Sequence, residues 1–356
     1  MKEAMAEHVA LLSCSIIERD SNGDILWTWI YPSITAEQRS LLTRKCGLDG
    51  DHSWPQPFLY GRFRNAWYYI NSTEVFESDN LPRVKQFALA LWAKDFNPEK
   101  YETFCRILSK TFCKTGSPTS MMQLYLSVLT RGSCMTKENG TFIVKDYEPN
   151  KHLVNTNVKD LIKTFGLETI LIYTALLLKK RIIVYHHSIE MLLKSLRTFP
   201  ALMWHRKTWD LLFPWVDLHA DELIDLKSNQ YYVAGCRDAS VCSRKDIYDI
   251  LINLPAKEIN IAPHAKESMT MTKTHKEIAL FMMQLSENPS ISEQQVVREI
   301  AGKTGDLLAH LKSLATVSTS DGKPMVCIET LREKNLPPAL ENFLFNLAIA
   351  ENMMML

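Results

Sequence analysis

The sequence has 356 residues, of which 46% are hydrophobic and 23% are charged, and its formal net charge is +1. These values are ordinary for a globular protein, and the length predicts two or three domains. The near-zero charge excludes nucleic acid as the main partner, because a surface that binds by counterion release needs a clear excess of basic residues.

The cysteines and the first residues indicate the compartment. No two of the eight cysteines form a C-x-x-C pair, and several lie inside apolar runs. This pattern is typical of reduced thiols that serve as small hydrophobic side chains. Residues 1–4 open no secretory or amphipathic targeting pattern. We therefore expect a cytoplasmic protein.

The first part of the chain alternates strand and turn signals before two helices. Val9–Ile17 and Ile25–Tyr31 predict two strands, and Asn22-Gly23 between them predicts a hairpin turn. Thr35 and Gln38 fit a capping box, so a helix is expected from there to about residue 46. Further strands are predicted at 58–63, 66–70 and 84–94, and helices after the X-Pro pairs at 97–98 and 117–118.

The stretch from Gly166 to His187 is the centre of the second half. Residues 167–178 are apolar nearly all round, with only Glu168 charged, which predicts a helix buried in protein. The uncharged run is too short for the roughly 20 residues that a membrane span needs, so no transmembrane segment is expected. Basic residues 179–181 follow, where cations suit the helix dipole. Ile182–Tyr185 then predicts a buried strand.

Residues 188–262 continue an α/β pattern. Ser188 is placed to cap a helix, and Tyr231–Gly235 predicts a strand parallel to Ile182–Tyr185. The intervening chain is long enough for the crossover that a parallel connection needs. Ile247–Ile252 adds a further short apolar segment.

Strand signals disappear beyond Pro263 and helical spacing replaces them. A capping box is expected at 290–293, and Gly302 and Gly305 can kink the following helix or end it early. Helical segments are also expected at 325–332 and 340–349. The predicted fold is α+β followed by α/β, with an all-helical end. Its parts are residues 1–135, a linker at 136–157, an α/β core at 158–262 and a helical section at 263–356.

The apparent catalytic motifs in the sequence lack residues or geometry that their chemistry requires. Gly302-Lys303-Thr304 resembles the end of a phosphate-binding loop, but Val297 stands where that motif needs its first glycine, and no strand precedes it. His186 and His187 would point to opposite faces of a strand, so they cannot both address one metal. The sequence contains no hydrolase or dinucleotide-binding motif. We therefore expect no catalytic residue, cofactor or metal.

Two features are open to more than one interpretation. Trp204, Trp209, Phe213 and Trp215 are interleaved with the basic residues 205–207, which fits a binding surface and a packed loop equally well. The methionines at 353–355 fit an adaptable contact, but a disordered end is the preferred interpretation.

The order and spacing of several local runs resemble the DENN-domain family. In the first part these runs are the hairpin at 22–23, Trp29–Pro32 and Ala93–Glu99; in the core they are Gly166–Glu168, Leu176–Ile183 and Tyr231–Gly235. The similarity covers essentially the whole chain. The chain departs from the family in its short helical section and at 228–230, where a proline usually precedes the last of these strands.

The resemblance implies a longin-like N-terminal lobe, an α/β DENN core and a helical C-terminal section. It also implies guanine-nucleotide exchange on a Rab-type small GTPase held across both lobes, at endosomes and late endosomes in particular, with peripheral membrane recruitment. No covalent chemistry is involved. An exchange factor binds the nucleotide-free GTPase more tightly than the loaded form, and reciprocity of coupling then weakens nucleotide binding.

No family motif specifies the contact residues, so we select them by expected exposure and interface chemistry. These residues are Thr35, Gln38, Arg39 and Leu42 on the first helix, and Trp204, Arg206 and Trp209 on the aromatic loop.

The competing hypothesis is a non-catalytic subunit. In this hypothesis the same fold is a docking surface in an endosomal sorting assembly of the Commander kind, with coiled-coil partners. A small-molecule enzyme is a third hypothesis, but no constellation of residues supports it.

Overall fold

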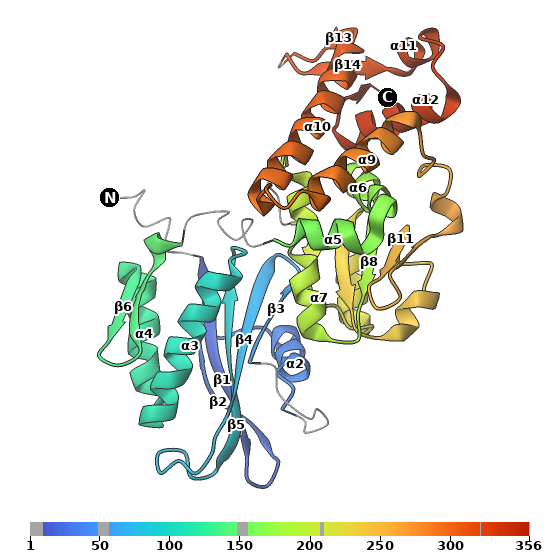
Figure 1. Ribbon diagram of the computed structural model, residues 1–356. Coiled ribbons are helices and arrows are strands. Elements are labelled where there is room, and N and C mark those ends of the chain that lie inside the picture. Colours follow the sequence, from blue (N-terminus) through green and yellow to red (C-terminus); the bar gives the residue numbers. More distant parts are fainter. Residues whose placement is uncertain (1–9, 49–56, 148–155, 207–209, 321, 356) are drawn as a thin grey trace. The chain divides into compact units, whose positions relative to one another are not determined.

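The computed structural model describes residues 10–48, 57–147, 156–206, 210–320 and 322–355. It is a mixed α/β structure, as the sequence predicts, and the chain divides into two compact units, Met1–His152 and Leu153–Leu356 (Figure 1). We call these unit 1 and unit 2. No helix in the described ranges combines the length and the apolarity that crossing a membrane requires.

Unit 1 is built on a five-stranded antiparallel sheet with strand order β2-β1-β5-β4-β3. The strands are β1 (Leu11–Asp20), β2 (Ile25–Tyr31), β3 (Phe58–Phe63), β4 (Ala66–Glu74) and β5 (Val84–Ala93). Helix α2 (Ala36–Lys45) lies on one side of the sheet, and α3 (Pro98–Thr115) and α4 (Pro118–Arg131) lie on the other (Figure 1). The five predicted strands and three predicted helices are confirmed, with small shifts at their ends.

A β-bulge in β2 separates two tryptophans. Ile17 pairs with Trp27 and Ile16 pairs with Trp29, so Thr28 is an extra residue in β2. Because neighbouring residues of β1 face opposite sides of the sheet, their two tryptophan partners do so too. The guanidinium of Arg39 on α2 lies over the ring of Trp27, which assigns Trp27 to the α2 side.

Gly61 is a position where packing requires glycine. It pairs across the sheet with Tyr68, whose side chain is fully buried. A Cβ atom at Gly61 would lie 2.1 Å from the Tyr68 hydroxyl oxygen and 2.3 Å from its ring. The tyrosine ring therefore occupies the space that any other residue at 61 would need.

A second, smaller sheet closes unit 1. Strands β6 (Ser133–Thr136) and β7 (Gly140–Ile143) form a hairpin, followed by the 3-10 turn η1 (Val144–Asp146). Its inward residues Cys134 and Phe142 are buried, and Phe142 stacks on Phe104 of α3 with the ring centroids 4.8 Å apart. Residues 140–146 were predicted as linker. The structure instead gives them ordered elements, because Phe142 completes the core beside α3.

Unit 2 contains a five-stranded sheet with order β12-β11-β8-β10-β9. Its strands are β8 (Arg181–Tyr185), β9 (Leu212–Phe213), β10 (Tyr232–Cys236), β11 (Ile250–Asn253) and β12 (Glu258–Ile261). All neighbours are parallel except β12, which runs antiparallel to β11. The predicted parallel pairing of β10 with β8 is confirmed, and β8 is the central strand.

Helices surround this sheet and continue beyond it (Figure 1). They are α5 (Val158–Phe165), α6 (Thr169–Leu177), α7 (Ile189–Leu196), α8 (Ala220–Lys227), α9 (Lys273–Glu287), α10 (Glu293–Ser313), α11 (Ile328–Glu333) and α12 (Pro338–Ala350). The 3-10 segments are η3 (Gly166–Glu168), η4 (Phe199–Met203), η5 (Ala239–Ser243) and η6 (Pro263–Ala265). The all-apolar helix α6 is buried, as predicted. It ends where Lys179 takes a φ of +51°.

The start of α5 is capped by a residue far along the chain. The carboxylate of Glu293, the first residue of α10, accepts hydrogen bonds from the backbone N–H groups of Val158 at 2.8 Å and Lys159 at 3.3 Å. In return, Nζ of Lys159 donates to the carbonyl of Asn288 at 2.8 Å, at the end of α9. This exchange joins the first helix of unit 2 to the α9–α10 corner.

Helix α10 differs from its prediction in two ways. Its N-cap is Ser292, which accepts from the N–H of Gln295, so the capping box expected at 290–293 does not form. The helix also runs through Gly302 and Gly305 to Ser313 without ending early. Midway along it, the buried Thr304 bonds Tyr173 of α6 at 2.8 Å, which ties this part of the helix to the core.

The prediction that strands are absent beyond Pro263 is wrong. Three short strands, β13 (Val317–Ser318), β14 (Pro324–Cys327) and β15 (Met354–Met355), form a sheet in which β15 runs parallel to β14. Met353 and Met354 are buried, so the preferred interpretation of a disordered end is also wrong.

Candidate partner-binding surfaces

The first half of α2 presents most of the predicted contact residues of unit 1. The capping box forms as predicted: the N–H of Gln38 donates to Thr35 Oγ1 at 3.2 Å, and the N–H of Thr35 donates to Gln38 Oε1 at 3.0 Å. Thr35 and Arg39 are exposed and Gln38 is half-buried. The three residues therefore lie on an accessible, structurally fixed helix start.

Arg39 is held in place by a tryptophan. Its guanidinium carbon lies 4.8 Å from the ring centroid of Trp27, within the range of a cation–π contact. Trp27 is itself only half-buried, so the pair forms an aromatic and cationic patch. Tryptophan and arginine are the residue types that most often anchor protein interfaces. We call this patch, with Thr35 and Gln38, the α2 patch.

Leu42 does not belong to the α2 patch. Its side chain is fully buried, together with Leu41, in the second half of α2. The expectation that Leu42 is exposed to a partner is therefore wrong. The Leu42 side chain instead holds α2 on the core of unit 1.

The aromatic loop of unit 2 places its predicted residues differently. Trp204 is half-buried at the end of η4, and Trp209 lies outside the described residues. Arg206 points into the unit, where it donates to the carbonyls of Leu176 at 2.8 Å and Leu177 at 2.6 Å. These are the last carbonyls of α6, so Arg206 caps the buried helix.

Arg206 also binds the C-terminal part of the chain. Its Nε donates to Glu351 at 3.1 Å, and a second guanidinium nitrogen bonds the same carboxylate oxygen. The side chains are 11% and 18% exposed. The expectation that Arg206 is exposed is therefore wrong. Its buried side chain links the end of α6 to the C-terminal part of the chain.

The environment of Glu351 stabilises its charge. Burial alone would raise its pKa, but His205 and Arg206 outweigh that effect and lower the pKa to about 2. The His205 ring nitrogen lies 3.5 Å from the carboxylate, at the outer limit of a hydrogen bond, so Arg206 is the principal partner.

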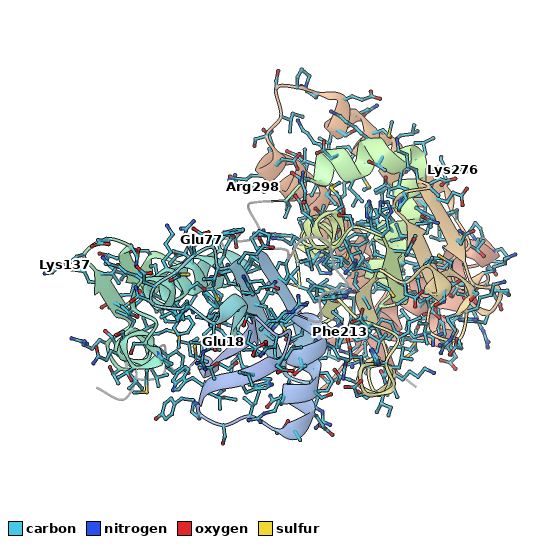
Figure 2. All side chains as sticks on the ribbon, turned by 90° about the horizontal axis from the view of Figure 1, so that it is seen from below. Glu18, Glu77, Lys137, Phe213, Lys276 and Arg298 are labelled. Atoms are coloured by element: carbon cyan, nitrogen blue, oxygen red, sulfur yellow. The ribbon has the colours of Figure 1, made fainter. Side chains whose placement is uncertain are left out.

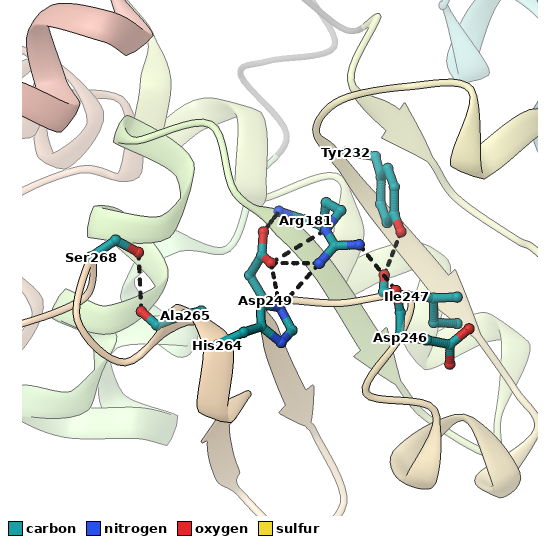
Figure 3. A network of polar contacts seen from close by, with 8 residues as sticks. All are labelled: Arg181, Tyr232, Asp246, Ile247, Asp249, His264, Ala265 and Ser268. Atoms are coloured by element: carbon teal, nitrogen blue, oxygen red, sulfur yellow. Dashed lines mark hydrogen bonds and ion pairs between the residues drawn. The ribbon is translucent and has the colours of Figure 1, made fainter.

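A second polar network lies where β8 and β11 begin (Figure 3). Arg181 donates its N–H to Asp249 Oδ2 at 2.8 Å and its guanidinium to Oδ1 at 2.8 Å and 3.2 Å. His264 Nε2 lies 2.9 Å from the same Oδ1, and Arg181 also donates to the carbonyl of Asp246. Burial raises the pKa of Asp249, but the hydrogen bonds from Arg181 outweigh this and the pKa falls.

This network is best explained as a structural clamp. The Asp249 carboxylate is occupied by Arg181 and His264, and it lies at the amino ends of parallel strands, whereas ligands of open α/β sheets bind at the carboxyl ends. No sequence motif marks Asp249 or His264. The only signal for them was a carboxylate directly before a short apolar run.

His186 and His187 lie beyond the carboxyl end of β8, not within it. Their rings stack with centroids 4.5 Å apart, and the N–H of Ser188 donates to Nδ1 of His186 at 2.9 Å. The expectation that they point to opposite faces is wrong, because the strand ends at Tyr185. Burial, followed by the neighbouring His187, lowers the pKa of His186. Nowhere in the described ranges do three His, Cys, Asp or Glu side chains converge in a way that would hold a metal ion.

Comparison with known proteins gives the family. Residues 155–263 match the family model described as "SPA: Stabilization of polarity axis". The chain is 46% identical over 344 residues to mouse DENN domain-containing protein 10, covering 97% of this chain and 96% of the mouse protein. It is 45% identical over 350 residues to the human protein of that name, covering 98% of each. Identity to the Dictyostelium discoideum protein of that name is 33% over 356 residues, covering 96% of this chain and 97% of the relative. The chain therefore belongs to the DENN-domain family, alongside proteins named DENN domain-containing protein 10.

Proposed function

We propose that this protein is a guanine-nucleotide exchange factor for a Rab-type small GTPase. The observation that supports this proposal best is its similarity over nearly the full length to DENN-domain proteins, a family that typically acts on Rab GTPases. In this proposal residues 1–135 are the longin-like lobe, which the β7 and η1 segment at 140–146 completes. The rest of 136–157 is the linker, 158–262 the DENN core and 263–356 the helical section. The central sheet of unit 1, with one helix on one side and two on the other, supports the first of these assignments.

The proposed mechanism uses binding energy alone. The protein would bind the nucleotide-free GTPase more tightly than the GDP-bound form, and by reciprocity GDP would then bind more weakly. A tenfold acceleration of GDP release needs about 1.4 kcal/mol of differential contact at the transition state. One well-placed patch of aromatic and arginine side chains can contribute that amount.

The contact residues that we propose are the predicted ones that are not buried, together with Trp209, which lies outside the described residues. In unit 1 they are the α2 patch, with Arg39 supported by Trp27 and flanked by Thr35 and Gln38. In unit 2 they are Trp204 and, by its place in the same loop, Trp209. Leu42 and Arg206 act indirectly in this proposal, by supporting α2 and by fixing the aromatic loop.

The test is release of fluorescent GDP from a panel of purified Rab proteins at substoichiometric amounts of the full chain. We expect multiple-turnover acceleration for at least one Rab. Arg39→Glu should reduce that acceleration about tenfold, or ~1.4 kcal/mol. Lys110→Glu makes the same charge change at an exposed position of α3, on the other side of the sheet, and should leave the rate unchanged. Flat traces for every Rab would contradict the proposal.

The same experiment distinguishes nucleotide exchange from the competing function. A non-catalytic subunit of a Commander-like endosomal sorting assembly would give flat traces together with stoichiometric co-purification of coiled-coil partners. In either function we propose peripheral recruitment to endosomes, with late endosomes as the first compartment to examine by fluorescence microscopy.

A further inference from the structure

An open groove in unit 1 lies between α4 and the outer face of the β6–β7 hairpin. Its volume is about 630 Å³, and its apolar lining comes from Leu124 of α4, Met135 of β6 and Ile143 of β7, with the buried Cys134 beside them. It is separate from the α2 patch, because α2 and α4 lie on opposite sides of the main sheet (Figure 1).

Two of the apolar residues that line the groove, Met135 and Ile143, do not build the core of unit 1. The hairpin uses its inward face, Cys134 and Phe142, to pack against the rest of the unit. Met135 and Ile143 alternate with these residues, so they point outward, and they are 76% and 39% exposed. Exposed apolar side chains that gather around a hollow are a mark of an interaction site.

The charged side chains that line the groove are basic. Arg131 and Lys145 line it, and none of the described lining residues is acidic. Lys137 is exposed in the hairpin turn, at the periphery of the unit (Figure 2). The neighbouring Glu138 is paired with Lys114 of α3, which compensates its charge. An occupant should therefore combine an apolar face with acidic flanks.

The shape favours a helix over an added strand. Along α4, Leu124, Ser127 and Arg131 follow one another at helical spacing, which gives the groove one ridged wall. The hydroxyl of Ser127 already donates to the carbonyl of Ser133 at 2.6 Å, so α4 blocks the start of β6 as an edge for strand addition. The flexible side chain of Met135 can adapt to an apolar helix face.

We propose that this groove binds an acidic amphipathic helix of another protein, with its apolar residues on Leu124, Met135 and Ile143 and its carboxylates facing Arg131 and Lys145. The proposal is independent of nucleotide exchange and concerns a different side of unit 1. It assigns the β6–β7 hairpin a role as a protein-docking element.

The test is fluorescence anisotropy with the full chain and two model peptides of about 18 residues, or five helical turns. Both peptides carry leucine at i, i+3, i+4 and i+7 positions; one carries glutamate elsewhere and the other lysine. The acidic peptide should bind at least tenfold more tightly than the basic one. Met135→Asp should weaken acidic-peptide binding at least tenfold. The matched control Phe76→Asp, at an 80% exposed side chain that does not line the groove, should leave it unchanged.

Charge reversal gives the sharpest outcome. Arg131→Glu combined with Lys145→Glu should reverse the preference toward the basic peptide, while far-ultraviolet circular dichroism stays that of the parent. Equal binding of the two peptides, or no effect of Met135→Asp, would overturn the proposal. Binding to vesicles of phosphatidylcholine and phosphatidylserine that is lost in Met135→Asp would also overturn it, because the groove would then belong to a lipid surface.

Discussion

Replacing Arg206 by methionine tests whether its buried contacts hold the chain end on the core of unit 2. The variant removes the bonds to the carbonyls of Leu176 and Leu177 and leaves the Glu351 carboxylate, only 18% exposed, without its main partner. Breaking one side of such a buried pair costs about 3–5 kcal/mol. The pKa of Glu351 is lowered from 4.5 to about 2, which corresponds to ~3 kcal/mol for the combined effect of His205 and Arg206 against burial.

Hydrogen exchange with mass spectrometry is the appropriate measurement. Arg206→Met should lower the opening free energy of amides in 169–178 and 343–355 by about 3 kcal/mol, with little effect on peptides of unit 1. Arg206→Met with Glu351→Leu should recover more than half of the loss, because no unpaired charge is then buried. Since the folded-state pKa lies below the unfolded value, the parent keeps this stabilisation above about pH 4.5 and loses it as the pH falls toward 2.

Two results would refute this reasoning. One is a loss below about 0.5 kcal/mol for Arg206→Met, which is the size of an ordinary surface substitution. The other is a double variant whose loss equals the sum of the two single losses, since residues that do not interact show additive effects.

Three further substitutions test other contacts. Glu293→Ala should lower the free energy of unfolding of unit 2 by about 1–2 kcal/mol in urea titration, because the first N–H groups of α5 lose their cap; an unchanged midpoint would contradict the cap. Asp249→Asn should cost about 1–3 kcal/mol at neutral pH by weakening the bonds to Arg181. The parent loses this stabilisation as the pH falls through and below 3.8, so the stability of the variant should depend less on pH in the acid range. The same acid dependence in variant and parent would argue against a stabilising Asp249 carboxylate. Gly61→Ala should destabilise unit 1 by about 1–3 kcal/mol in thermal unfolding, and combining it with Tyr68→Leu should cancel part of that loss.

Local signals in the sequence predict most of unit 1 and the centre of unit 2. The hairpin turn, the Thr35–Gln38 capping box and the β-branched run of β8 each depend on residues within a few positions of one another. The buried helix α6 is predicted because it lacks a polar face. These elements have one conformation that local chemistry and tertiary packing both favour.

The failures concern contacts between distant residues. Strand β15 consists of two residues and pairs with β14 far along the chain, so no local periodicity marks it. Arg206 is predicted from the sequence to be exposed, because its partner Glu351 lies 145 residues later in the chain. Leu42 is a local exception, because it lies in the second half of α2, where Leu41 and Lys45 are buried as well.

The contacts that join the start of α5 to the α9–α10 corner have a consequence for how unit 2 reaches its native state. Helix α5 receives its cap only after the chain has continued for 135 residues, and Tyr173 of α6 bonds Thr304 131 residues later. Contacts between such distant residues slow folding and delay native order. A fragment that stops before α9 would expose to water the part of the all-apolar helix α6 that packs against α9, and such surfaces lead to aggregation. Expression of the α/β part should therefore yield insoluble material unless the α9–α10 corner is made with it.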